Sequence, residues 1–124
     1  MAVSHNLTEV TTALFNPESG RLDASRIAKE MGVPVATIAS AIHRKAPSVR
    51  KSPDASSLQE GLRKLYRVWT ALVELYAGDQ GHARIFLNAP NRNFDNRAPM
   101  EFIQNGDLAQ LELYVDTMIA RLPN

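Results

Sequence analysis

Cysteine is absent from this chain of 124 residues, and so is any long apolar run. Without cysteine the protein has neither disulfide bonds nor a thiolate metal site, which fits a reducing cytoplasm. The longest stretch without Asp, Glu, Lys or Arg extends only from Met31 to His43, whereas a membrane-spanning helix needs about 20 mostly apolar residues. The N-terminal stretch lacks a basic start and carries Glu9, which is not typical of a signal peptide. We therefore expect a cytoplasmic protein with no membrane segment.

Motifs of catalysis are missing as well. The histidines, His5, His43 and His82, are scattered without metal-ligand spacing, so we expect no metal site. No serine lies in a nucleophile-elbow motif, and there is no glycine-rich phosphate-binding loop. The acidic pair Asp95 and Glu101 would need a cleft for acid/base work, and the sequence does not indicate one. These absences favour a protein that is not an enzyme and needs no cofactor.

Charge is distributed unevenly along a chain whose formal net charge is only +1. Residues 43–67 contain seven bases and two acids, whereas residues 68–124 contain four bases and seven acids. The basic middle suggests an anionic partner, and the acidic C-terminal third suggests a different partner. The alternative is that each charged run is only a solvated face.

Apolar spacing predicts an all-α fold, because no stretch alternates with period two for long. A first helix is predicted from Asn6 to Leu14, and the further helices are predicted over residues 23–31, 34–42, 58–76, 79–87, 100–104 and 108–122. Residues 46–57 are rich in proline and serine, which predicts a connector between two helical halves. We therefore expect a helix-turn-helix part over residues 1–50 and a small helical part over residues 51–124.

The predicted helix from Leu58 to Tyr76 carries a seam of apolar residues in steps of four and three. Its members are Leu58, Leu62, Leu65, Trp69, Leu72 and Tyr76. The seam is too short for a free-standing coiled coil, so it packs either on the domain's own helices or on a second copy. We expect Trp69 in the core. We also expect a homodimer, because the seam offers apolar surface and DNA half-sites come in pairs.

Residues 25–42, SRIAKEMGVPVATIASAI, have the spacing of a helix-turn-helix. Ala28 allows two helices to cross closely, and Gly32 allows the tight turn that must follow. Two ordinary packed helices would show the same spacing. In a DNA-binding motif, the side chains directed toward the groove would be those of Val35, Ala36, Thr37, Ala39, Ser40, His43 and Arg44.

Few of these side chains can read a base, whereas the basic residues that follow suit phosphates. The predicted DNA-binding residues are Thr37, Ser40, His43, Arg44, Lys45, Arg50 and Lys51. The alternative is that the face formed by Val35, Ala36 and Ala39 packs between subunits.

The segment NAPNRNFDNRAP, residues 88–99, predicts an irregular surface loop, because asparagine and proline both compete with helix. This loop is either a structural connector alone or a segment that also offers polar groups to a partner.

The run from Ala83 to Met118 resembles the toxin-binding domain of the Xre/MbcA/ParS antitoxin family. The matching features are Phe86 and Leu87, Pro90-Asn91, Phe94, Arg97, Pro99, Gly106 and the apolar stripe from Leu111 to Ile119. Together with the helix-turn-helix spacing, the resemblance extends over roughly residues 23–122. The chain departs from the family at Asp95-Asn96, where members often carry glycine, so we expect some strain in a left-handed turn there.

The resemblance implies an antitoxin of a type II toxin-antitoxin system, whose partner is a RES-domain toxin that consumes NAD. Antitoxins of this kind block the toxin's active site, often with residues near their own C-terminus, and repress their operon by binding operator DNA. The residues implied for toxin binding are Asn88, Pro90, Asn91, Phe94, Arg97, Pro99, Arg121, Leu122, Pro123 and Asn124. The tail has the alternative interpretation of a frayed terminus. The alternative function is a helix-turn-helix transcription regulator with no toxin partner.

Overall fold

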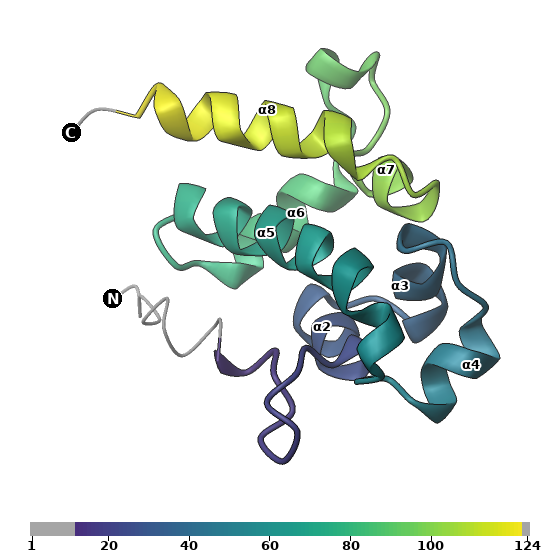
Figure 1. Cartoon of the computed structure of the whole chain (residues 1–124). Coiled ribbons are helices and arrows are strands. Elements are labelled where there is room, and N and C mark those ends of the chain that lie inside the picture. Colours follow the sequence, from purple (N-terminus) through teal and green to yellow (C-terminus); the bar gives the residue numbers. More distant parts are fainter. Residues whose placement is uncertain (1–11, 123–124) are drawn as a thin grey trace.

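The computed structural model describes residues 12–122, and this part of the chain is helical (Figure 1). Its elements, with η for a 3-10 helix, are α2 (Ala24–Met31), α3 (Val35–Ala41), α4 (Ala46–Lys51), η1 (Ser56–Leu58), α5 (Gln59–Leu75), α6 (Gln80–Asn88), η2 (Arg92–Phe94), α7 (Met100–Gln104) and α8 (Leu108–Ala120). Residues 12–122 contain two isolated β-bridges and no strand, so the predicted all-α fold is confirmed. The helix predicted from Asn6 lies mostly outside the described residues. No helix in the described range is long and apolar enough to cross a membrane.

The helix-turn-helix spacing is present as α2, a short turn and α3. Asp23 caps α2 by accepting hydrogen bonds from the backbone N–H groups of Ser25 and Arg26, at 2.8 and 3.1 Å. Gly32 ends the helix in the left-handed conformation with φ of 72°, which glycine adopts without steric cost. Ala28 is buried where α2 packs against α3. These local signals place both helices where the spacing predicts them.

The predicted connector, residues 46–57, is instead largely helical, because it forms α4 and then η1. Pro47 lies in the first turn of α4, where its missing N–H removes no intrahelical hydrogen bond. Val49 is fully buried and anchors this short helix to the core. The prediction of a connector was wrong because proline at this position favours a helix start.

Helix α5 lies in the middle of the molecule and packs against α2, α6 and α8 (Figure 1). Its seam is buried inside the chain itself, since Leu62, Leu65, Trp69 and Leu72 are all 0% exposed. The core position of Trp69 is confirmed. The expectation that this seam offers apolar surface to a second copy was wrong, because helices of the same chain already cover it.

One hydrophobic core joins the two halves of the chain, with α3 packed against α7, α2 against α6 and α5 against α8. Gly61 lets α5 pass close to the end of α3, because a Cβ there would lie 2.8 Å from the Cβ of Ile42. From α6, the Arg84 Nε donates to the Glu30 carbonyl oxygen at the end of α2, at 2.8 Å. The helix-turn-helix is therefore packed onto the C-terminal half. The functional division at residue 50 stays a prediction.

The C-terminal helices follow the predicted order. Asp79 caps α6 by accepting a hydrogen bond from the His82 backbone N–H, at 3.1 Å. Pro99 directly precedes α7, and Gly106 with φ of 72° follows its end. Asp107 precedes α8 as predicted, but its side chain makes no capping hydrogen bond to this helix. The start of α8 is thus set by the turn at Gly106 and by packing.

Candidate partner-binding surfaces

The loop between α6 and α7 is organised around Asn91. The Asn91 carbonyl oxygen accepts hydrogen bonds from the N–H groups of Phe94 and Asn96, each at 2.9 Å, and its own N–H donates to the Arg97 carbonyl oxygen at 3.1 Å. The Asn91 side chain adds a fourth bond, because its Oδ1 accepts from the Asn93 N–H at 2.8 Å. A residue implied for toxin binding thus holds the loop in one shape.

The turn inside this loop is left-handed at two consecutive non-glycine residues. Asp95 has φ of 56° and Asn96 has φ of 64°. Side chains other than glycine rarely adopt this conformation, which asparagine and aspartate tolerate better than most. The strain expected from the missing glycine is therefore located at these two residues.

Some of the residues implied for toxin binding are interior. Phe94 is 5% exposed and packs between the rings of Phe102 and Tyr114, with centroid distances of 4.9 Å to each. Pro99 is buried as well, whereas Asn88, Pro90 and Arg97 are exposed. The Arg97 guanidinium lies over the Phe102 ring, 4.8 Å from its centroid. The buried residues shape the loop, and the exposed ones are accessible to a partner.

A chain of aromatic rings connects α5, α6, α8 and the loop. Tyr76 lies 6.3 Å from Phe86, Phe86 lies 5.9 Å from Tyr114, and Tyr114 lies 4.9 Å from Phe94, measured between ring centroids. Burial, together with the nearby Tyr114, raises the pKa of the Tyr76 phenol. Ring pairs of this kind add stability beyond their buried area, so these contacts help hold α6, α8 and the loop together.

The end of α8 extends beyond the core that its first part covers (Figure 1). Leu111 and Val115 are 0% exposed, whereas Leu122 on the same stripe is 46% exposed. Arg121 is also exposed beside it. Pro123 and Asn124, the other implied tail residues, lie outside the described residues. An apolar residue and a cation are thus available together at this end.

Two exposed apolar residues in this half were not predicted as binding residues. Leu113 is 68% exposed and Ile85 is 65% exposed. Leu113 lies two positions from both Leu111 and Val115, which places it about 200° around the helix from each. A large apolar residue off the periodic stripe is the sequence signal that would have identified Leu113.

Helix α3, predicted to face DNA, is enclosed by α2, α4 and α7. Ser40 is exposed, and Val35, Ala36 and Thr37 are half-buried. Ala39 is 1% exposed, so it faces neither a groove nor another subunit. The expectation for Ala39 was wrong because α3 packs against neighbouring helices on several sides. The surface that α3 leaves to a partner is therefore small, uncharged and limited to its first turn and Ser40.

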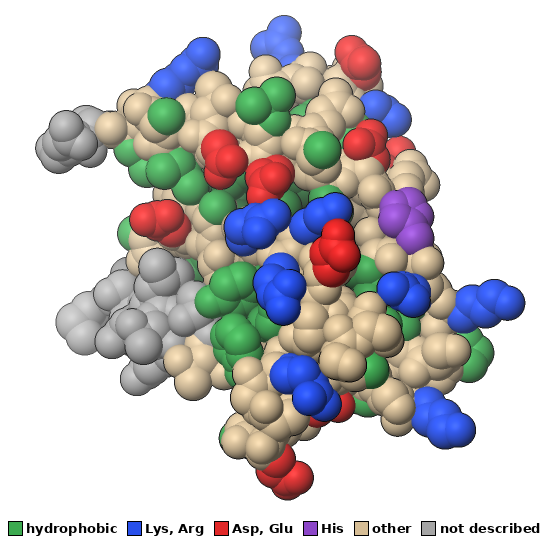
Figure 2. Space-filling model, viewed as in Figure 1, with side chains coloured by type: hydrophobic (Ala, Val, Ile, Leu, Met, Phe, Trp, Pro, Cys, Tyr) green, Lys and Arg blue, Asp and Glu red, His purple; other side chains and the backbone are tan. Residues whose placement is uncertain are grey.

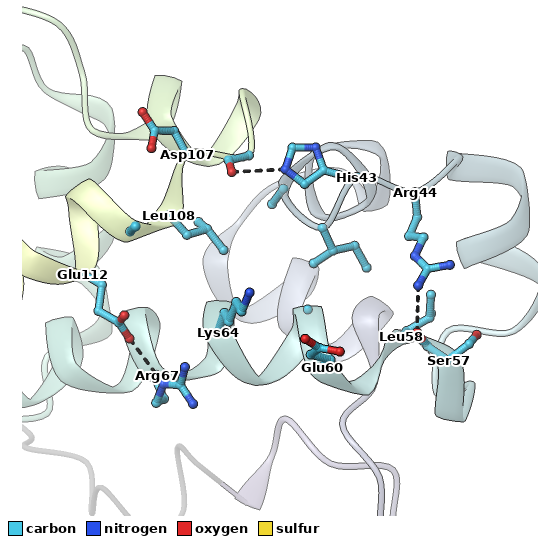
Figure 3. Close-up of a pocket in the computed structure, with 15 residues that line it drawn as sticks. His43, Arg44, Ser57, Leu58, Glu60, Lys64, Arg67, Asp107, Leu108 and Glu112 are labelled. Atoms are coloured by element: carbon cyan, nitrogen blue, oxygen red, sulfur yellow. Dashed lines mark hydrogen bonds and ion pairs between the residues drawn. The ribbon is translucent and has the colours of Figure 1, made fainter.

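The predicted DNA-binding residues after α3 are exposed, but two of them are engaged within the chain (Figure 3). The His43 Nε2–H donates to the Gly106 carbonyl oxygen at 3.2 Å. The Arg44 Nη2 donates to the Ser57 carbonyl oxygen at 3.0 Å. Lys45, Arg50 and Lys51 are exposed on and before α4. Of the predicted DNA-binding residues after α3, His43 and Arg44 are therefore hydrogen-bonded within the chain, whereas Lys45, Arg50 and Lys51 are exposed on its surface.

A cavity of about 420 Å³ lies between the end of α3, the first half of α5 and the start of α8 (Figure 3). Bases and acids both line it, among them Arg44, Lys64 and Arg67 beside Glu60 and Glu112. The Arg67 Nε is 3.3 Å from the Glu112 Oε2, so this pair compensates its own charge. The mixed lining does not single out one class of small ligand.

Comparison with protein families identifies the C-terminal half. Residues 71–118 match the antitoxin Xre/MbcA/ParS C-terminal toxin-binding domain. The matched segment begins inside α5 and ends inside α8, so it contains α6, the asparagine-rich loop and α7. No curated protein and no solved structure matches the chain. A match to a toxin-binding domain agrees with the expectation that this part of the chain binds a partner protein.

Proposed function

Because residues 71–118 match the Xre/MbcA/ParS C-terminal toxin-binding domain, we propose that this chain is the antitoxin of a type II toxin-antitoxin pair. Its partner is a RES-domain toxin, an enzyme that consumes NAD. The antitoxin inhibits by steric blockade, with its C-terminal helices seated over the mouth of the toxin's active site.

The observation that carries this proposal is the uncovered end of α8 beside the matched domain. Leu122 is 46% exposed at the end of a stripe that is buried at Leu111 and Val115 and half-buried at Met118 and Ile119. An apolar side chain at the tip of a helix suits a pocket on another protein, and Arg121 suits a site made for phosphate groups. The proposed toxin contacts are therefore Arg121 and Leu122, continued by Pro123 and Asn124.

The asparagine-rich loop supports this surface in a second way. Asn91 and Phe94 fix its shape from inside, as their hydrogen bonds and ring contacts indicate. The exposed Asn88, Pro90 and Arg97 supply polar and apolar groups at the rim of the contact. A stiff loop loses little conformational entropy on binding, which favours affinity.

We further propose that the chain represses its own operon as a homodimer bound to operator DNA in the cytoplasm. The basic stretch of residues 43–67 supports an anionic partner. The residues proposed to bind DNA are different from those proposed to bind the toxin.

Aspartate substitutions on α8 and directly after it test the blockade. Leu122→Asp is expected to weaken inhibition of NAD consumption by the co-purified RES toxin by about thirtyfold, since losing a buried contact of this kind costs about 2 kcal/mol. Leu113→Asp is the control, because Leu113 is a leucine that is 68% exposed on α8 and lies outside the proposed contact. The measurement is residual NAD hydrolysis against antitoxin concentration. Equal losses in both variants, or none in Leu122→Asp, would contradict the proposed contact.

The alternative, a transcription regulator without a toxin, differs in one observable. The antitoxin restores growth to cells that express the RES-domain open reading frame beside its own gene, whereas a plain regulator leaves them arrested. Failure of the wild-type chain to restore growth or to bind that toxin would reject the proposed function.

A further inference from the structure

The exposed face of α5 is basic. Arg63, Lys64 and Arg67 are exposed and lie at helical spacing on the side opposite the buried seam, with Glu60 one turn earlier. In the view of Figure 2, where α5 is in front, blue side chains gather across the middle of this face. None of these three bases belongs to the predicted DNA-binding set.

Two arginines from other segments flank the start of α5. The Arg21 Nε donates to the Asp54 carbonyl oxygen at 2.8 Å, and the Arg44 Nη2 donates to the Ser57 carbonyl oxygen at 3.0 Å. Both arginines are exposed, and each keeps further N–H donors besides the one used in its hydrogen bond. A guanidinium that is already anchored loses less entropy when it binds an anion. The α5 basic face is defined here as Arg21, Arg44, Arg63, Lys64 and Arg67.

Acids interrupt this face without neutralising it. Glu112 is paired with Arg67 at 3.3 Å, and Glu60 lies among the bases on α5 itself. Asp107 at the start of α8 lines the neighbouring cavity. The five basic residues span α5 from its start to its middle, a row of charge that complements an extended polyanion better than a single small anion.

Helix α3, the DNA-reading helix of a conventional helix-turn-helix, offers a small surface without charge. Ser40 is exposed and Val35, Ala36 and Thr37 are half-buried, while α7 packs against that helix from the C-terminal half. These side chains can contact base edges, but none is a cation that would bind phosphate.

We propose that the α5 basic face, and not α3, is the surface that contacts the phosphate backbone of duplex DNA. This inference rests on the DNA binding proposed above and assigns the residues that make the contact. Arginine forks and the Lys64 ammonium bind phosphate oxygens, so affinity depends steeply on salt and weakly on base sequence.

Matched double substitutions test the surface. Arg63→Ala/Lys64→Ala is expected to lower affinity about tenfold for a fluorescently labelled duplex that covers the operon's promoter, and to reduce the log-log salt slope by about two. Arg26→Ala/Lys29→Ala removes the same charge from exposed positions on α2 and is expected to leave both quantities unchanged. The measurement is fluorescence anisotropy over a salt series. Unchanged melting curves and toxin inhibition establish that both variants are folded.

A second pair distinguishes α5 from α3 directly. Lys64→Ala and Ser40→Glu each lower the net charge by one, and the first is expected to weaken binding more. Glu60→Gln is expected to tighten binding, which a folding defect cannot imitate. If Ser40→Glu or Arg26→Ala/Lys29→Ala has the larger effect, the α5 surface is rejected while DNA binding stands. If the wild-type chain does not bind the duplex at low salt, the proposed repression and this inference both fail.

Discussion

Helices α3 and α8 are both predicted to meet a partner, but the fold leaves them very different surfaces. In α3 only Ser40 is exposed, because α2, α4 and α7 pack around it. Helix α8 is covered on one side by α5 and α7, and it leaves Leu113 and Leu122 exposed. The comparison teaches that a binding motif in a sequence does not guarantee accessible surface, since later helices can cover it.

One close contact between the two halves lies directly after α3. His43 follows α3 with φ of 59°, and its ring lies over Gly106 in the turn between α7 and α8. A Cβ at Gly106 would come within 2.3 Å of the His43 ring. Gly106 is needed in this turn for two reasons. Its φ is in the left-handed region, and the absence of a side chain leaves room for the His43 ring.

The largest expected effect comes from breaking this contact. Gly106→Ala is expected to lower the free energy of unfolding by about 2–4 kcal/mol, through left-handed strain and overlap with His43. Gly20→Ala is the control, because Gly20 has φ of 73° and nothing within 4 Å of its would-be Cβ. That control is expected to lose only about 1 kcal/mol from backbone strain. Urea denaturation of both variants measures the difference, and equal losses would show that the His43 contact does not matter.

An intermediate loss of stability is expected from removing the aspartate before α2, and a smaller loss from removing the aspartate before α8. Asp23→Ala is expected to cost about 1–2 kcal/mol, because Asp23 accepts two backbone hydrogen bonds at the start of α2. Asp107→Ala removes an aspartate from the same position before α8, where it makes no capping hydrogen bond. Its expected cost is only about 0.3 kcal/mol, from the helix dipole. Thermal unfolding of the two variants checks the order, and a larger loss at Asp107 would reverse the interpretation.

The smallest expected effect relieves strain in the C-terminal half. Asn96→Gly is expected to stabilise the protein by about 0.5 kcal/mol, because glycine adopts φ of 64° without steric cost. Asn93→Gly in η2 is expected to destabilise the protein by about 0.5–1 kcal/mol. Glycine makes the unfolded chain more flexible, and position 93 gains nothing from it because its backbone is not left-handed. Chemical denaturation measures both. Destabilisation by Asn96→Gly would mean that the asparagine side chain contributes more than its backbone strain costs.

Local patterns predicted much of the fold. The start of α2 at Asp23, its end at Gly32 and the cap of α6 at Asp79 were all readable, because these signals act within a few residues. The helical nature of residues 46–51 was not, since proline is compatible with both a break and a first turn. The candidate toxin-binding loop was located correctly as irregular, but its interior and exterior residues were not separated.

By itself, the sequence determined the helical class, most helix ends and the family of the C-terminal half, because periodicity, capping and turn chemistry are local properties. Only the tertiary structure decided that the α5 seam is covered within the chain, that α3 is enclosed and that the end of α8 is open. Periodic apolar residues show that a face is buried but not which neighbour buries it. That choice depends on contacts between residues far apart in the chain.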